Sequence, residues 1–348
     1  MDPVTHALTS FALARGIFPR RPWWFVLGVV FAGTIADADL ASALVGPGAY
    51  LSARHTFTHS IVGTVVVILV AVGIVLLLRP KGGRAAENTL RKAGPTSASG
   101  IATFLIAATM AAVAHALMDV STSVGVAVLW PWRETRFAWD WLPGVDPWIL
   151  ALLLAGILLP ELFGLVGSEI GAKDKSPRGR TGAIATLVLV LIYVAARATL
   201  LGNAVAQLDA HTYRGESPRR LAALADPLSL VTWHGVAETA TQICAVSVPA
   251  LESARFDPEN GVCVHKPEDT PALAAAEQAE ATKKFLRAAP FPKASVSATQ
   301  DGTEIVVRDA RNSAEGETRF AVAVRILLDR KGKVTSQEIL WANEVHLR

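Results

Sequence analysis

The sequence predicts an α-helical polytopic membrane bundle of five or six helices, residues 1–202, followed by a small soluble α+β domain, residues 203–348. Hydrophobic residues make up 51% of the 348 residues, charged residues 18%, and the mean hydropathy is +0.38. This composition is too apolar for an ordinary soluble enzyme and too mixed for a pure membrane bundle. Long apolar runs stop near residue 203, and alternating patterns typical of strands follow.

Five apolar runs are expected to cross the bilayer. They cover residues 23–35, 61–78, 101–117, 148–166 and 183–201. Residues 3–18 form a possible sixth segment, interrupted only by His6 and Arg15, although this length also suits an interfacial helix or the apolar part of a signal peptide. The signal-peptide interpretation is the weaker one, because Asp2 stands where a basic region is expected.

The basic residues of the loops predict the orientation of this bundle. Lys and Arg collect in residues 15–21, 79–92 and 173–180, whereas the other loops contain few basic residues. The positive-inside rule places the three basic loops in the cytoplasm. We therefore expect an integral protein of a bacterial-type inner or plasma membrane, with the opposite helix ends and the C-terminal domain on the external, periplasmic side.

Histidine and aspartate side chains recur at or near this external end of successive apolar segments. Ionisable groups at membrane depth are costly and usually functional, so the repetition predicts one polar site built from several helices. All the candidate ligands offer nitrogen or oxygen, which suits one or two divalent transition metal ions, with zinc favoured and manganese or iron possible. The seven candidate metal ligands are His6, Asp37, Asp39, His55, His59, His115 and Asp119.

Two of these pairs have the spacing of one helical face. His115 and Asp119 are four residues apart at the end of an apolar helix, and the paired carboxylate favours ligation over a buried core histidine. His55 and His59 have the same spacing. Their alternative is an interfacial histidine pair at a helix start, where Thr58 or Ser60 acts as the cap.

The turn at residues 19–22 predicts a further convergence. His6 and Asp37 lie nearly equidistant from it, so two antiparallel helices would bring them to one depth. Asp37 and Asp39 are both candidate catalytic residues. Alternate positions on a helix point about 200° apart, so we expect one to be a ligand and the other an outer partner or general base. Alternatively, the pair merely ends the span among the headgroups.

This ligand set predicts hydrolysis. Two metal ions can generate hydroxide at neutral pH and hold the oxygens of a transferring phosphoryl or acyl group. A site recessed near the headgroups suits an amphiphilic substrate, a lipid or lipid-linked phosphoester being favoured over a carboxylic ester or amide. The rival prediction is a non-hydrolytic metal-binding membrane protein, such as a transporter or assembly factor. A transporter should carry ionisable residues along both halves of its path, and here the cytoplasmic halves are nearly free of acids and histidines.

The loop after Asp119 combines hydroxyl groups, two arginines and four tryptophans. Tryptophan is typical of the headgroup level, so we expect these rings to anchor a re-entrant loop. Guanidinium groups bind phosphate or carboxylate, and both headgroup binding and simple anchoring are open for the arginines. The predicted substrate-binding residues are Thr58, Ser121, Thr122, Arg133 and Arg136.

These motifs resemble those of the YdjM-like family of predicted membrane-bound metal-dependent hydrolases, over roughly residues 1 to 150. The resemblance implies a membrane hydrolase with metal ligands at the matching positions. The motifs that carry it are Met-Asp-Pro-Val-Thr-His6, Ile-Ala-Asp37-Ala-Asp39, Arg-His55-Thr-Phe-Thr-His59-Ser and His115-Ala-Leu-Met-Asp119.

The order His, Asp, His, His-x3-Asp is also similar to zinc-dependent phospholipases C and single-strand nucleases, whose substrates are phosphoesters. Their additional His-x3-Glu motif has a counterpart in His234 and Glu238. This segment is strand-like and distant in sequence from the helices, so we favour a structural role for it.

The C-terminal domain is expected to be a single α+β domain after a helical extension and linker at residues 202–227. Asp301-Gly302 and Lys331-Gly332 predict hairpin turns. Cys244 and Cys263 are the only cysteines, and a disulfide and a reduced pair are both compatible with the sequence. Strands are expected at residues 230–236, 242–248, 295–299, 304–307, 320–328 and 333–340, and helix at 271–288.

This domain contains no nucleophile motif, phosphate loop or basic stripe, so its expected role is to guard the substrate or bind a partner. Nucleic-acid binding is not expected. The expected partners are membrane lipid and an amphiphilic small-molecule or lipid-linked substrate, and the sequence leaves the oligomeric state open.

Overall fold

The computed structural model describes residues 1–78, 98–169, 179–251, 255–312 and 321–344. The basic loops predicted at residues 79–92 and 173–178 lie outside this described part. The chain divides into two compact units. The first unit comprises residues 1–38, 57–133 and 137–196, and the second comprises residues 39–56, 134–136 and 197–348.

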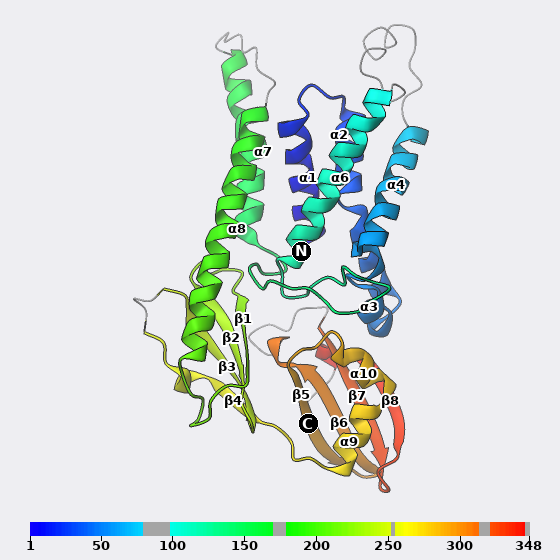
Figure 1. Ribbon diagram of the computed structural model, residues 1–348, viewed down its shortest axis with the longest axis vertical. Helices are drawn as coiled ribbons and strands as arrows, with labels where there is room; N and C mark the ends of the chain where they lie inside the picture. Colours follow the sequence, from blue (N-terminus) through cyan, green and yellow to red (C-terminus); the bar gives the residue numbers. More distant parts are fainter. Residues whose placement is uncertain (79–97, 170–178, 252–254, 313–320, 345–348) are drawn as a thin grey trace. The chain divides into compact units, whose positions relative to one another are not determined.

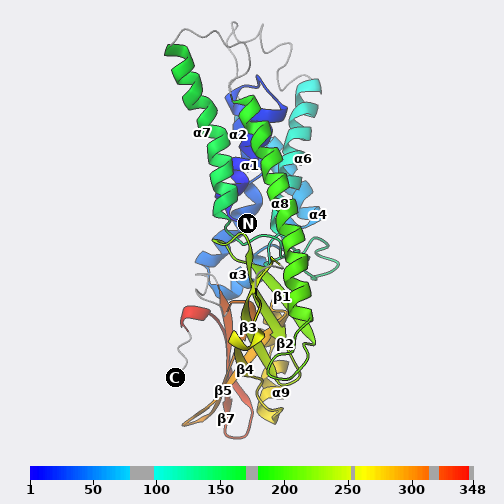
Figure 2. The same cartoon turned by 90° about the vertical axis from the view of Figure 1, so that its left-hand side faces the viewer.

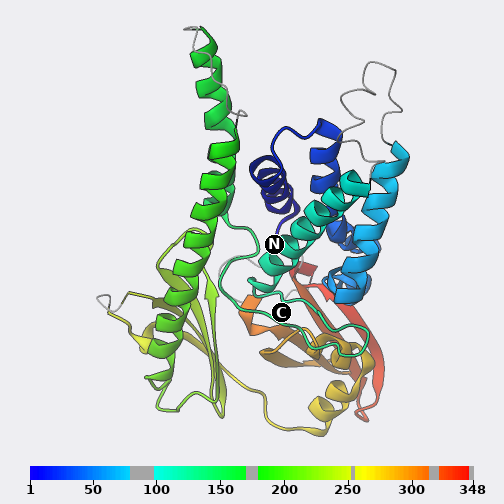
Figure 3. The same ribbon diagram turned by 45° about the horizontal axis from the view of Figure 1, so that its top comes forward.

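The first unit is helical (Figure 1). Its helices are α1 (Pro3–Ile17), α2 (Trp23–Ala32), α4 (Ile61–Leu78), α6 (Ala98–Val120), α7 (Pro147–Glu169) and the first part of α8 (Arg180–Asp209). The side chain of Asp2 accepts the backbone N–H of Thr5 at 2.9 Å, which caps α1. Helices α1, α2, α4 and α6 pack side by side (Figure 3). Their shared core contains two aromatic rings, Phe25 and Phe104, surrounded mainly by small and β-branched residues.

Two described helical segments, Gly100–Val120 and Arg180–Asp209, are long and apolar enough to cross a membrane. Two bent helix pairs, Trp23–Ala32 with Ile35–Leu44 and Pro47–His59 with Ile61–Leu77, raise the number of candidate spans to four. Five or six spans were expected, so the prediction is confirmed only in part. One physical reason is that α2 ends at Ala32, where the expected run was continuous, and the chain continues as a 3-10 helix bent by 54°.

Helices α7 and α8 approach each other through glycine. A Cβ atom on Gly156 would collide with the side chain of Thr186, and a Cβ atom on Gly182 would collide with Pro160. Small residues let helix backbones come close in lipid, where dispersion contacts replace the hydrophobic effect as the main source of association. Leu153 and Ala183 are buried at the same interface.

The variant Gly156→Ala should therefore be less stable than the wild type by about 1–3 kcal/mol, because its methyl group overfills the α7–α8 contact. Thermal unfolding of the detergent-purified protein measures this. Gly73→Ala in α4 is the matched control, because a Cβ atom there meets nothing within 4 Å. Equal unfolding temperatures for the two variants would contradict this account of the packing.

The second unit contains two antiparallel four-stranded sheets. The first sheet has the order β1-β2-β3-β4 and the second β5-β6-β7-β8. The strands of the first sheet are β1 (Arg220–Ala225), β2 (Thr232–Glu238), β3 (Gln242–Pro249) and β4 (Val262–His265). Those of the second are β5 (Pro292–Thr299), β6 (Gly302–Asp309), β7 (Val322–Asp329) and β8 (Val334–Trp341).

Each sheet is covered by helix on one face. The last turns of α8 pack on the first sheet through Ala204 and Leu208, against the buried ring of Trp233 (Figure 2). Helices α9 (Pro271–Gln278) and α10 (Glu280–Leu286) cover the second sheet. Cys244 and Cys263 face each other across β3 and β4 and form a disulfide.

The six expected strands correspond to β2, β3, β5, β6, β7 and β8, and both hairpin turns lie where they were predicted. Two strands were missed. Residues 202–227 were expected to be helix and linker, but β1 forms there, although its sequence Arg-Leu-Ala-Ala-Leu-Ala favours a helix; pairing with β2 overrides this propensity. Strand β4 has only four residues, and the helix expected at residues 271–288 breaks at Ala279, whose backbone is extended.

A segment between α2 and α4 also belongs to the second unit. It includes most of the 3-10 helix η1 (Ile35–Leu44) and the short helix α3 (Pro47–Ala53). Tyr50 packs on Trp341 of β8, with ring centroids 5.5 Å apart, and Lys284 donates a hydrogen bond to the Gly48 carbonyl at 3.2 Å. Strand β8 and helix α10 therefore hold residues 39–56, the part of the chain that connects Asp37 to His59.

Candidate metal centre

Five of the seven candidate ligands come together inside the first unit. His6 lies in the first turns of α1, whereas His115 and Asp119 lie in the last turns of α6. Asp37 lies in η1, just after α2, and His59 ends the 3-10 helix η2 (Phe57–His59) that precedes α4. The expected pairing of His6 with Asp37 is confirmed, since His6 Nε2 lies 3.9 Å from Asp37 Oδ2.

Asp119 is the centre of this cluster. Its carboxylate is fully buried, and three imidazole nitrogens surround it. The distances are 3.1 Å from His6 Nε2 to Oδ1, 3.0 Å from His59 Nε2 to Oδ2 and 3.1 Å from His115 Nε2 to Oδ2. The terminal amino group of Met1 also contacts Oδ1.

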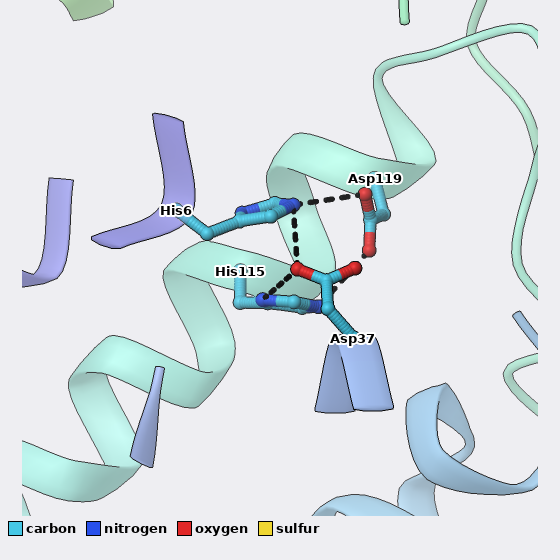
Figure 4. Close-up of side chains that lie close together, drawn as sticks. All are labelled: His6, Asp37, His115 and Asp119. Atoms are coloured by element: carbon cyan, nitrogen blue, oxygen red, sulfur yellow. Dashed lines mark hydrogen bonds and ion pairs between the residues drawn. The ribbon is translucent and has the colours of Figure 1, made fainter. Parts of the chain in front are cut away.

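Asp37 lies slightly farther from the ring nitrogens, and its carboxylate is between the His6 and His115 rings, on the same side as Asp119 (Figure 4). Its oxygens are 4.0 Å from His59 Nε2 and 3.9 Å from His115 Nδ1. One ligand atom from each of four residues, His6, Asp37, His115 and Asp119, lies within 4.8 Å of all the others. Ligand atoms 2.0–2.2 Å from a tetrahedral zinc ion are roughly 3.3 Å apart, so the cluster has the dimensions of a metal site.

Hydrogen bonding sets which nitrogen His115 presents to the cluster. Its Nδ1–H donates to the Gly33 carbonyl at 2.8 Å, because a carbonyl oxygen can only accept. The lone pair therefore lies on Nε2, which is 3.0 Å from His59 Nε2. His59 Nδ1 in turn contacts the Thr58 hydroxyl at 2.9 Å. The Nε2 atoms of His59 and His115 repel each other at this distance unless a proton or metal ion lies between them. The hydrogen bond from His115 to a backbone carbonyl is also typical of metal-binding histidines.

Gly33 is a site residue that the sequence reasoning missed. It follows α2, and a Cβ atom there would collide with Ser10 of α1. The signal was the glycine at the end of an apolar run, immediately before the aspartates. A cavity of about 10 Å³, room for about one water molecule, borders His59 and His115 and is lined mainly by small side chains such as Ala32 and Ala112.

His55 and Asp39 make contacts within the second unit. Asp39 Oδ1 accepts from Arg54 Nη1 at 2.6 Å, and Oδ2 accepts the backbone N–H of His55 at 2.8 Å. The expectation that His55 and His59 share a helix is wrong. His55 has φ +54°, in the left-handed region, and η2 begins only at Phe57. The roles of His55 and Asp39 as ligands, and of Asp39 as a base, stay predictions.

The expected cap is confirmed for Ser60, whose hydroxyl accepts the N–H of Gly63 at 3.0 Å at the start of α4. Two of the predicted substrate-binding hydroxyls donate to carbonyls at the end of α6. Ser121 bonds Leu117 and Thr122 bonds Asp119, both at 2.8 Å.

The two arginines of the loop after Asp119 differ in their surroundings. Arg133 is exposed, whereas Arg136 donates to the Arg54 carbonyl at 2.9 Å. Burial lowers the pKa of Arg136. Substrate contact by either arginine, as by the hydroxyls, stays a prediction.

His234 and Glu238 lie in β2, as expected for a structural segment. Glu238 forms ion pairs with Lys266 at 2.7 Å and with Arg220 at 3.3 Å. The pair with Arg220 joins β2 to β1, and the pair with Lys266 joins β2 to the residue that follows β4. Glu238 therefore has structural partners of its own.

A known membrane protein family matches the helical N-terminal part of the chain. Residues 1–204 match the family described as YdjM inner membrane protein. No curated protein and no solved structure matches the chain. The matched segment covers more than half of the 348 residues and includes all seven candidate ligands. The chain therefore belongs to the YdjM inner membrane protein family.

Proposed function

We propose that this protein is a membrane-bound metal-dependent hydrolase that acts on an amphiphilic substrate, with a lipid or lipid-linked phosphoester as the favoured class. One observation carries the proposal. Three imidazoles and two carboxylates, all buried, converge at one end of an apolar helical unit. Buried charges in such surroundings are usually paired or bind metal, and ionisable residues inside membrane segments are usually functional.

The residues present fit a divalent transition metal ion, with zinc favoured. His6, His59, His115 and Asp119 would hold it, since the Nε2 atom of each imidazole is 3.0–3.1 Å from an oxygen of Asp119. The set lacks cysteine and mixes imidazole with carboxylate, as catalytic zinc sites do. His55 is only four residues from His59, so the chain itself keeps it within reach as a ligand to a second ion.

A metal ion bound here would supply Lewis acidity for hydrolysis at neutral pH. The chain supplies the remaining functions. The Gly33 carbonyl fixes the tautomer of His115. The Asp37 carboxylate lies 3.9–4.0 Å from the ring nitrogens, farther than that of Asp119. We assign it to accept the proton of the attacking water.

The membrane family supports an amphiphilic substrate. We place the site at the external side, and we assign Arg133 and Arg136 to an anionic substrate group, which favours a phosphoester. The rival function is a metal transporter or assembly factor. In the described part of the first unit, buried histidines and acids gather near the starts of α1, α4 and α7 and the ends of α2 and α6 rather than along the whole bundle. This distribution supports an enzyme.

The metal site predicts the composition of the purified protein. Wild-type protein should contain one or two transition metal ions per chain, and His59→Ala and Asp119→Ala should lose them, because each removes a central ligand. Elemental analysis of detergent-purified protein measures this. His265→Ala, which changes an exposed histidine of β4, is the control and should keep the metal. The metal assignment fails if both ligand variants keep the wild-type content.

Hydrolysis is tested separately from metal binding by two isosteric variants. Asp37→Asn should keep the metal but lower turnover by about 10²–10⁴-fold, the usual contribution of a general base. Asp119→Asn should lose both metal and activity. Rates on a chromogenic phosphodiester and on a chromogenic carboxylic ester, followed by ³¹P NMR on phospholipid vesicles, give the readouts.

A metal-loaded wild type that cleaves none of these substrates would contradict the hydrolase proposal. Metal uptake by proteoliposomes, abolished in Asp119→Asn, would then support transport. Faster cleavage of the carboxylic ester than of the phosphodiester would overturn the preference for phosphoesters alone.

A further inference from the structure

Arg197 connects helix α8 to the first sheet by contacts that no sequence pattern predicted. It lies in the apolar part of α8 and is only 1% exposed. Its Nη1 donates to the carbonyls of Ser229 and Leu230, each at 2.9 Å, and its Nη2 to the carbonyl of Asp226 at 3.3 Å. The guanidinium also lies over the Trp233 ring, 4.5 Å from its centroid. The loop between β1 and β2 is therefore fixed at the level of Arg197.

The level of Arg197 relative to the bilayer follows from the length of α8. Arg197 is seventeen residues after Arg180, where α8 begins, and this distance corresponds to about 25 Å along a helix. The hydrocarbon core is about 30 Å thick, so Arg197 lies close to the membrane boundary opposite Arg180. An arginine at such a depth normally extends its guanidinium to water or headgroups. Here the loop carbonyls take that place.

The loop turns its polar groups inward and its apolar side chains outward. Asp226 Oδ1 accepts the backbone N–H groups of Leu228 and Ser229 at 2.7 and 2.9 Å. The side chain of Leu228 is 77% exposed and that of Leu230 is 41% exposed. Val231, which accepts a hydrogen bond from Ala250 N–H, is also exposed.

The exposed patch extends beyond this loop. Leu251, next to Ala250, is exposed too. Leu228, Leu230, Val231 and Leu251 thus form an apolar patch with no charged side chain among them, at the level of a membrane boundary.

We propose that this patch, the loop patch, is immersed in the headgroup and acyl boundary of the bilayer that α8 crosses. Apolar side chains exposed beside a span are stabilised at this boundary, where they leave water without losing backbone hydrogen bonds. The three carbonyls held by Arg197 have their acceptors satisfied, so the loop can enter this region without the cost of unpaired backbone groups. The first sheet is consequently held against the membrane surface. This inference is independent of metal binding and hydrolysis.

Site-directed spin labelling of the full-length protein in phosphatidylethanolamine and phosphatidylglycerol vesicles tests the proposal. Leu228→Cys carries the label in the loop patch. Val262→Cys is the matched control, because Val262 is similarly exposed, at 71%, but lies in β4 at the edge of the same sheet. The native cysteines form a disulfide and should not react with a maleimide label.

The label at residue 228 should collide several-fold more often with oxygen, which concentrates in lipid, than with a water-soluble nickel complex. The label at residue 262 should show the reverse. Equal accessibility of the two positions to the nickel complex would overturn the proposal. A label at residue 228 that neither reagent reaches would also overturn it, and would indicate a protein partner or a second copy on the patch. Leu230→Cys gives an independent reading if Leu228→Cys does not fold.

Discussion

The structure depends above all on keeping two carboxylates buried inside an apolar helical unit. An isolated ionised carboxylate in such surroundings costs many kcal/mol, so it must be paired, protonated or bound to metal. Asp119 meets this constraint by lying 3.0–3.1 Å from three imidazole nitrogens that come from three different segments. The terminal amino group of Met1 pairs with one of its oxygens, and a divalent cation among the imidazoles would balance both carboxylates. The convergence of the helix ends thus has an electrostatic reason.

The same constraint explains where the helices break. Asp37 lies in a 3-10 helix after α2, and His59 lies in another before α4. Irregular backbone is tolerated at membrane depth only where it is buried in protein or lines a polar site. The Gly33 carbonyl, released at the end of α2, is used by His115. The bends that reduce the number of simple spans are therefore the places where two candidate ligands, Asp37 and His59, join the cluster.

Periodicity predicted the parts of the site that regular helices position. His115 and Asp119 share a face of α6, and His6 lies near Asp37, as expected from their nearly equal distances along the chain from a tight turn. The sequence did not reveal that His55 has a left-handed backbone. That conformation depends on the Asp39 carboxylate, which binds the His55 N–H while pairing with Arg54, and such contacts have no periodic signature.

The missed strands have a similar cause. In β1, pairing with β2 outweighs a local sequence that favours helix, and β4 is too short to alternate visibly. Long alternating strands, by contrast, carry their own signal. The sequence thus predicts the strands whose own pattern alternates. Strands such as β1 depend instead on pairing with residues distant along the chain.

Most of the chain between Asp37 and His59 belongs to the second unit, although both of these residues belong to the first. Residues 39–56 leave the first unit after Asp37, make their contacts in the second unit and return just before His59. They are held there by the packing of Tyr50 on Trp341 and by the hydrogen bond from Lys284. Both ends of this loop carry cluster residues, so restricting the loop restricts the positions of Asp37 and His59. In this way the contacts of residues 39–56 restrict two members of the cluster, and a metal site requires its ligands to be held before the ion binds.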